Sequence, residues 1–271
     1  MTDFNRVTNY YKDFDEQNRL LKDSSGKFEY KMTMRILNKY ISSDNKILDL
    51  GGASGIYTFP LAKQGNYLTL ADLSPKLIEQ AKEKIASDKI MNIISCDVEN
   101  AVNLSYGDEK FDIVLLFGPL YHLLERTERE KCIKEVYRVL KKGGLVFASF
   151  IPYLSGSIAI IDRYYRHNDQ VTTYNLEETF KTGKFINNSS NGFQEGYYSK
   201  SEEIVDLFNK YKFSKIDLLS IRGIGYEKED NIYNIDDKNM FDKIIKIIDD
   251  TCRMPEVIEM CGHAMYIGKK F

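Results

Sequence analysis

The sequence predicts an α/β fold built around a seven-stranded, mostly parallel sheet. Between residues 46 and 151, short apolar segments alternate with amphipathic helical patterns, and a glycine-rich segment follows the first apolar segment. Two further apolar segments lie near the end of the chain. Alternating strands and helices form βαβ units, in which helices cover both faces of a parallel sheet.

Each strand of this sheet is predicted from an apolar segment. Five are expected in the first part of the chain, at residues 46–50, 67–71, 91–95, 111–117 and 145–150. Ser74-Pro75 predicts a helix start after the second strand, and Thr127-Glu-Arg-Glu130 forms a capping box for a helix that Gly143-Gly144 would end. Two late strands, at 215–221 and 264–269, would complete the sheet, with a helix at 240–250 between them.

One domain with elaborations is expected from 271 residues of which 43% are hydrophobic. Residues 1–40 are expected to be a helical lid and residues 41–151 a ligand-binding core. At residue 152 the composition shifts toward tyrosine, asparagine, serine and glycine, so residues 152–200 are interpreted as an insertion after the fifth strand that covers a substrate. Residues 201–271 would complete the sheet.

Charge and cysteine content exclude several classes of function. The net charge is −2, which gives no field that would attract nucleic acid or an anionic membrane. The four cysteines form no C-x-x-C pair, so neither a zinc site nor a disulfide framework is indicated. No apolar segment is long enough to cross a membrane. We therefore expect a cytoplasmic protein with no metal, nucleic-acid or membrane partner, while the oligomeric state stays open.

The segment Asp49-Leu-Gly-Gly-Ala-Ser-Gly55 is typical of a loop that holds a nucleotide-like ligand. Glycines let the backbone approach a ligand closely, so Gly51, Gly52, Ala53 and Gly55 are candidate contacts. A methyl group at position 53 is tolerated if the backbone there keeps negative φ. A dinucleotide fingerprint would need glycine at positions 53 and 56, which are alanine and isoleucine. A nicotinamide-dependent oxidoreductase is therefore disfavoured.

Carboxylates lie at the ends of three successive predicted strands, at the sheet edge where α/β proteins bind ligands. Asp49 could attract an ammonium group rather than a phosphate. Asp72 lies 23 residues later, where a ribose diol would be bound, with Leu73 beside it. Asp97, next to Val98, could accept a hydrogen bond from an adenine amino group.

These motifs resemble those of the class I S-adenosylmethionine-dependent methyltransferases, in particular the methyltransferase type 11 group. Two further segments add to the resemblance: Phe111 to Leu123, which contains Phe117, and Arg138-Val-Leu-Lys-Lys-Gly-Gly144. The resemblance implies a Rossmann-like fold and S-adenosylmethionine as cofactor, with Phe117 beside it. The Gly-Pro-Leu-Tyr-His-Leu segment at 118–123 and Tyr10-Tyr11 are similar to a bacterial subgroup acting on small molecules or peptides. Arg19 could pair with the cofactor's carboxylate.

The expected reaction is in-line transfer of a methyl group to nitrogen or oxygen of a small molecule or peptide, releasing S-adenosylhomocysteine and needing no metal. A noncatalytic cofactor-binding or regulatory protein is the alternative. Catalytic candidates are His122 as a base, Tyr121 and Tyr11. Candidates for acceptor binding are Glu29, Asp162 and Tyr197. His263 is expected to orient the last strand.

Overall fold

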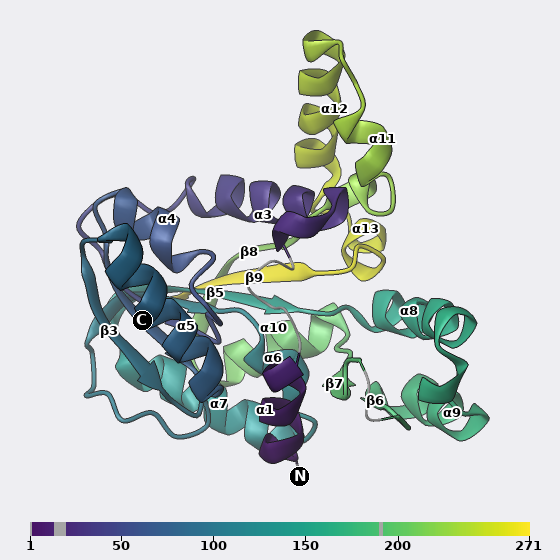
Figure 1. The fold of residues 1–271 in the computed structure, drawn as a ribbon, viewed down its shortest axis with the longest axis horizontal. Coiled ribbons are helices and arrows are strands. Elements are labelled where there is room, and N and C mark those ends of the chain that lie inside the picture. The colour runs from purple at the N-terminus through teal and green to yellow at the C-terminus, as the bar shows by residue number, and fades with distance from the viewer. Residues whose placement is uncertain (1, 14–19, 190–191) are drawn as a thin grey trace.

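The protein folds around one seven-stranded sheet, seen in the computed structural model of Figure 1, which describes residues 2–13, 20–189 and 192–271. The strand order is β3-β2-β1-β4-β5-β9-β8. The strands are β1 (Lys46–Leu50), β2 (Tyr67–Asp72), β3 (Ile93–Val98), β4 (Phe111–Leu116), β5 (Leu140–Phe150), β8 (Phe213–Ser220) and β9 (Ala264–Lys270).

Strands β1 to β5 pair in parallel, and β9 lies antiparallel between β5 and β8. The predicted Rossmann-like sheet is therefore confirmed, although some strand ends differ. The third strand begins at Ile93 rather than residue 91, because Lys89 and Asn92 have φ values of 49° and 65°, which no strand accommodates. The fifth strand begins at Leu140, so the helix before it ends at Val139, ahead of Gly143-Gly144.

Helices cover both faces of the sheet because buried side chains alternate along its strands. Ile47, Ile113 and Phe147 join one core cluster, while Leu48, Val114 and Val146 join the other. The first cluster includes side chains of α3 (Ser24–Leu37), α4 (Thr58–Lys63), α5 (Pro75–Asp88) and α12 (Lys238–Thr251); the second includes those of α6 (Pro119–His122), α7 (Arg126–Val139), α10 (Ser201–Lys210) and α13 (Pro255–Glu259).

Residues 152–200 leave the sheet and return to it at one point, where Pro152 bridges Ser199. They form α8 (Tyr153–Arg166), the 3-10 turn η1 (Asn168–Gln170), α9 (Thr173–Thr182) and the hairpin of β6 (Lys184–Ile186) with β7 (Glu195–Tyr197). Figure 1 shows α8 and α9 projecting at one side of the sheet. Their small core contains Ile160 and Phe185.

The N-terminal helix α1 (Phe4–Asp13) lies against the hairpin of the insertion. Arg6 Nη2 donates to the Asn187 carbonyl oxygen at 2.6 Å, and the Asp3 amide donates to Glu195 Oε1 at 3.1 Å. Thr2 is held by Glu128 of α7, whose Oε2 accepts from Thr2 Oγ1 at 2.6 Å. The remaining helical segments are η2 (Gly223–Gly225) and α11 (Glu229–Tyr233), which stands with α12 away from the sheet (Figure 1).

No helix within the described ranges is long and apolar enough to cross a membrane.

Candidate active site

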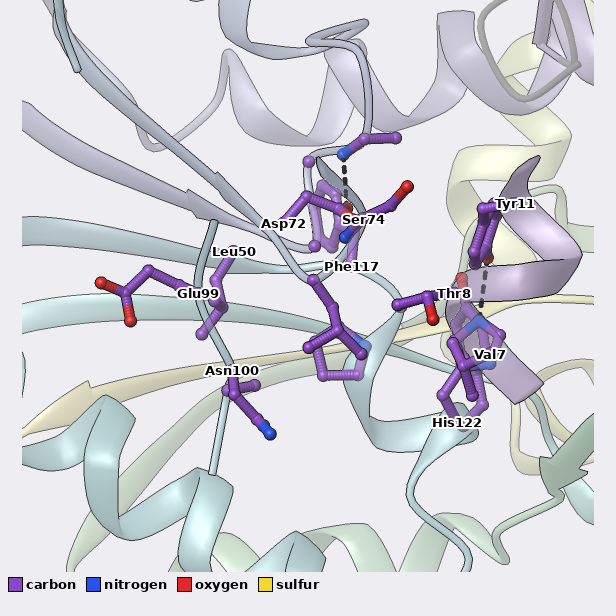
Figure 2. A pocket seen from close by; sticks show the side chains of 18 of the residues that line it. Val7, Thr8, Tyr11, Leu50, Asp72, Ser74, Glu99, Asn100, Phe117 and His122 are labelled. Atoms are coloured by element: carbon purple, nitrogen blue, oxygen red, sulfur yellow. Dashed lines mark hydrogen bonds between the residues drawn. The ribbon is translucent and has the colours of Figure 1, made fainter. Parts of the chain in front are cut away.

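A cavity of about 980 Å³, counting its mouth, lies at the carboxyl ends of β1, β2 and β4, beneath α1. This is the edge where parallel α/β sheets bind ligands, and the volume is that of a small-molecule site. Figure 2 shows Asp72 and Ser74 on one side of Phe117 and Tyr11 with His122 on the other. The cavity therefore has two chemically different ends.

The glycine-rich loop forms one wall of the cavity. Gly51 and Gly55 have φ values of 79° and 93°, which explains the glycines there. Ala53 also has positive φ, at 50°, a conformation that a β-carbon disfavours. Its amide donates to Asp72 Oδ2 at 2.9 Å, a bond that stabilises this backbone conformation despite the methyl group (Figure 2).

Asp49 is completely buried directly beneath this loop. Its Oδ2 accepts from Thr58 Oγ1 at 2.6 Å, while Oδ1 has no hydrogen-bond partner among the described residues. Burial raises the pKa of this carboxyl to about 6, opposed by the bond from Thr58. A cationic ligand group above the loop would therefore find an electrostatic partner with an unused oxygen.

Asp72 ends β2 at the rim of the cavity, beside Leu73. Besides the bond from Ala53, its Oδ1 accepts from the Ser74 amide at 2.8 Å. Two backbone donors thus fix the carboxylate in one orientation. A carboxylate at the end of the second strand of a βαβ unit is placed where a ribose diol would be bound.

Asp97 lies within β3 and is placed away from the cavity. Its Oδ2 accepts from Ser95 Oγ at 2.7 Å and from Tyr106 Oη at 2.8 Å. Val98 is half exposed and does not line the cavity either. The cavity wall at this strand end is formed instead by the three residues that follow, Glu99, Asn100 and Ala101, which the sequence analysis missed. Their position immediately after β3, at the ligand-binding edge of the sheet, could have identified these three residues as part of the cavity wall.

At the other end of the cavity, His122 is partly buried among aromatic side chains. Its Nε2 lies 2.9 Å from Tyr11 Oη, and its Nδ1 has no partner among the described residues. The rings of Tyr11, Tyr121 and Phe193 surround it at centroid distances of 5.8, 5.1 and 5.4 Å. Burial lowers the pKa of His122 to about 4, so the imidazole is neutral near pH 7.

A second, smaller cavity of about 300 Å³ adjoins the first. Three aromatic residues, Tyr57, Phe117 and Tyr121, line both cavities and separate them. Glu29 lies in the second cavity, where its Oε2 is 3.0 Å from His263 Nδ1. The structure thus brings the predicted residues Tyr11, Tyr121, His122 and Glu29 to two adjoining spaces, and adds His263.

Other predicted acceptor residues are placed elsewhere. Asp162 is exposed on α8 and pairs with Arg166 at 3.0 Å. Tyr197 is buried, donates to Glu203 Oε2 at 3.1 Å and stacks beneath the Arg129 guanidinium. Neither lines the two cavities, because the insertion turns α8 outward and packs β7 against α6. Arg19 lies outside the described residues.

The donor set fits S-adenosylmethionine rather than a dinucleotide. The cavity offers a fixed carboxylate at Asp72 for a diol. Asp49 does not line the cavity but is buried behind the glycine-rich loop, where its negative charge would attract an ammonium group. Glu99, Asn100 and Ala101, which follow β3, also line the cavity, and a base ring could lie beside them. The aromatic wall could contact a sulfonium through ring faces.

Comparison with known proteins agrees with this fit. Residues 48–148 match the methyltransferase domain family. Over 102 residues the chain is 37% identical to the ubiquinone/menaquinone biosynthesis C-methyltransferase UbiE of Zymomonas mobilis, covering 37% of this chain and 40% of that protein. With the protein of the same name from Haemophilus ducreyi it shares 26% identity over 199 residues, covering 64% of this chain and 74% of that protein. The chain thus spans about two fifths of the first curated relative.

Two solved structures share the fold. PH0226 from Pyrococcus horikoshii aligns with a TM-score of 0.64 at 18% identity, covering 97% of this chain and 99% of that chain. A SAM-dependent methyltransferase from Methanosarcina mazei aligns with a TM-score of 0.61 at 20% identity, covering 87% and 97%. Residues 48–148 thus match a methyltransferase domain, the sheet has the fold of S-adenosylmethionine-dependent methyltransferases, and both findings support S-adenosylmethionine as the cofactor.

Proposed function

We propose that the protein transfers a methyl group from S-adenosylmethionine to a small acceptor and releases S-adenosylhomocysteine. The observation that carries this proposal is the single cavity that joins Asp72 and the glycine-rich loop to His122 and Tyr11. One end has the groups that a nucleoside and an amino acid require. The other end is enclosed, largely aromatic and next to a second space where an acceptor could lie.

Bound in this cavity, S-adenosylmethionine supplies a methyl group on a positively charged sulfur, which a nucleophile displaces in line. The chain's own residues would position this reaction. Asp72 and Asp49 hold the two polar ends of the cofactor, and Tyr57, Phe117 and Tyr121 exclude water at the point where the cavities meet. His122 orients the Tyr11 hydroxyl at the roof of the site.

Nitrogen or oxygen of a small molecule or peptide is the acceptor atom that we propose. Two features support a small acceptor: the enclosed volume of the second cavity, and the cover that α1 forms over the first. A carbon acceptor is the second candidate, favoured by the similarity to the UbiE proteins, which are named C-methyltransferases. Product analysis distinguishes the three atoms.

Two measurements test the proposal. Calorimetry with S-adenosylhomocysteine should show binding, whereas NADH should not bind. Purified protein with methyl-labelled S-adenosylmethionine should then label at least one member of a panel of small amines, alcohols, phenols and quinols, and mass spectrometry should locate the methyl group.

Cofactor binding with no labelled product from any acceptor would favour the noncatalytic alternative. Stabilisation by NADH, without stabilisation by S-adenosylhomocysteine, would instead favour an oxidoreductase.

A further inference from the structure

We propose that the second cavity is the acceptor pocket, and that His263, oriented by Glu29, removes the proton from a hydroxyl group of a small, largely apolar acceptor. This inference rests on the proposed methyl transfer and deepens it, because it assigns the general base and selects oxygen as the acceptor atom. The residues that carry it come from α3, the end of β5, the segment before β9 and the aromatic wall.

Glu29 and His263 form a buried dyad. The Glu29 side chain is 9% exposed and that of His263 is 19% exposed, and their contact joins Oε2 to Nδ1 at 3.0 Å. An ionised carboxylate only accepts hydrogen bonds, so His263 Nδ1 carries the proton and Nε2 of the neutral ring has a free lone pair. Among the described residues, no hydrogen bond to Nε2 is found. The ring is therefore prepared to accept a proton at that atom.

The surroundings keep this carboxylate ionised and fixed. Arg222 Nε lies 3.6 Å from Glu29 Oε2, and Arg222 Nη1 donates to Glu229 Oε1 at 2.9 Å. The Arg222 guanidinium thus lies between the carboxylates of Glu29 and Glu229. Gly262 has φ of 78°, and a Cβ there would lie 2.1 Å from Arg222 Nη2, so the backbone before His263 is held close to this guanidinium.

His122 is less suited to this role, although it is the histidine nearer the glycine-rich loop. Its Nε2 is engaged by Tyr11, and burial among aromatic rings lowers its pKa to about 4. A base with so low a pKa accepts a proton poorly near neutral pH. His263 has a carboxylate beside it, whereas the rings around His122 carry no charge that would stabilise an imidazolium.

The cavity lining indicates the class of acceptor. Ile221, Met265, Phe117, Tyr57 and Tyr121 form its apolar walls. The polar lining includes Thr33, whose Oγ1 is buried and has no partner among the described residues, and Ser149. A compact phenol fits this pattern, because its ring would meet the apolar walls while its hydroxyl meets His263.

In this step a proton moves from the acceptor hydroxyl to His263, and a methyl group moves from sulfur to the acceptor oxygen. The acceptor O–H bond breaks and its proton moves to His263 Nε2, while an oxygen electron pair forms the new bond to the methyl carbon. The bond from that carbon to sulfur breaks, and its electron pair stays on sulfur, which becomes neutral. His263 then releases the proton to water, which returns the ring to its starting state.

The first test reads the dyad directly, without catalysis. Long-range ¹H–¹⁵N NMR of the full chain with ¹⁵N-labelled histidine should show His263 with its proton on Nδ1, and Glu29→Gln should reduce this preference. Titration with 4-nitrophenol as a probe should perturb the His263 signals and raise the absorbance of the ionised phenol; His263→Asn should lose that absorbance. A proton on Nε2 in the unaltered protein would overturn the assignment.

The second test measures kinetics with phenol, catechol and 4-nitrophenol as acceptors. His263→Asn, which can still donate to Glu29, should lower kcat about 100-fold or more, with binding of S-adenosylhomocysteine unchanged. Glu29→Gln, a change in a positioning residue, should lower kcat less and leave KM nearly constant. His167→Asn is the matched control, because His167 is exposed at the end of α8 and should have no effect.

The other possible results of the kinetic test contradict different parts of the proposal. A rate for His263→Asn within about threefold of the unaltered protein would remove His263 as the base. Methylation of amines or ring carbons, with none of phenolic oxygen, would overturn the hydroxyl assignment but leave the proposed methyl transfer intact. No methyl transfer to any acceptor, despite cofactor binding, would contradict the proposed function itself.

Discussion

The two ends of the site are built in different ways. At the cofactor end, Asp49, the loop to Gly55 and Asp72 come from consecutive segments of one βαβ unit. At the acceptor end, Tyr11, Glu29, His122 and His263 come from four distant parts of the chain. The position of a loop between paired strands is therefore fixed by local sequence. The shape of a pocket under a lid depends instead on how separate elements pack.

The largest effect is expected at the cofactor end, from Asp72→Ala. The substitution removes a charged acceptor for two hydroxyl groups and the partner of the Ala53 amide, which should cost about 2–4 kcal/mol of binding free energy. Calorimetry should show affinity for S-adenosylhomocysteine reduced by a factor of about 30 to 1000. Asp97→Ala is the matched control, since Asp97 bonds Ser95 and Tyr106 outside the cavity, and it should leave this affinity nearly unchanged.

Equal loss of affinity in both variants would mean that Asp97 also reaches the cofactor. The placement of the base ring at Glu99 to Ala101 would then need revision.

A methyl group at Gly52 tests how closely the loop packs on Asp49. An added Cβ would lie 2.4 Å from Leu70 Cδ1 and 2.6 Å from Asp49 Cγ, so Gly52→Ala should destabilise the fold by about 1–3 kcal/mol and weaken cofactor binding. In Gly107→Ala the new methyl meets no atom within 4 Å. Chemical denaturation should therefore separate the two variants; indistinguishable midpoints would show that the loop shifts freely.

The dependence of cofactor affinity on pH tests the role of Asp49. Its pKa of about 6 is above the ordinary value of 3.8, so below pH 6 the carboxyl becomes neutral and loses its attraction for an ammonium group. Affinity for S-adenosylhomocysteine should rise about tenfold between pH 5 and pH 7. In Asp49→Asn this rise should disappear; its persistence there would assign the titration to another group.

The raised pKa of Asp49 also changes how the stability of the ligand-free fold depends on pH. A carboxyl whose folded pKa is raised stabilises the fold below its unfolded pKa of 3.8, and this contribution is lost as the pH rises through about 6. Asp49→Asn should therefore gain in relative stability by about 2 kcal/mol between pH 4 and pH 7. Urea unfolding at the two pH values measures the difference.

The smallest effect is expected at the acceptor end, from Tyr11→Phe. Loss of the hydroxyl that contacts His122 Nε2 at 2.9 Å should cost about 1 kcal/mol, because one neutral hydrogen bond is removed while the ring still packs. Turnover of an acceptor should fall about fivefold, with cofactor affinity unchanged in calorimetry. A large loss of cofactor affinity would place the Tyr11 hydroxyl at the other end of the cavity.

The fold could be predicted largely from the sequence, but the site only in part. The seven strands, the helices on both faces and the loop from Asp49 to Gly55 followed from apolar periodicity and glycine placement. The positive φ of Ala53 could not be predicted, because alanine adopts it only with the support of the Asp72 carboxylate. The displacement of Asp97 from the cavity depends on a bond from Tyr106, nine residues away.

By itself, the sequence determined the sheet, its ligand-binding edge and the acids that follow its strands, because these depend on interactions between neighbours in the chain. Only the tertiary structure decided that His263 meets Glu29, that His122 is enclosed by Phe193, and that Asp162 faces outward. Glu29 and His263 are 234 residues apart. No local pattern specifies such a contact, which exists because α3 and the segment before β9 pack at the same edge of the sheet.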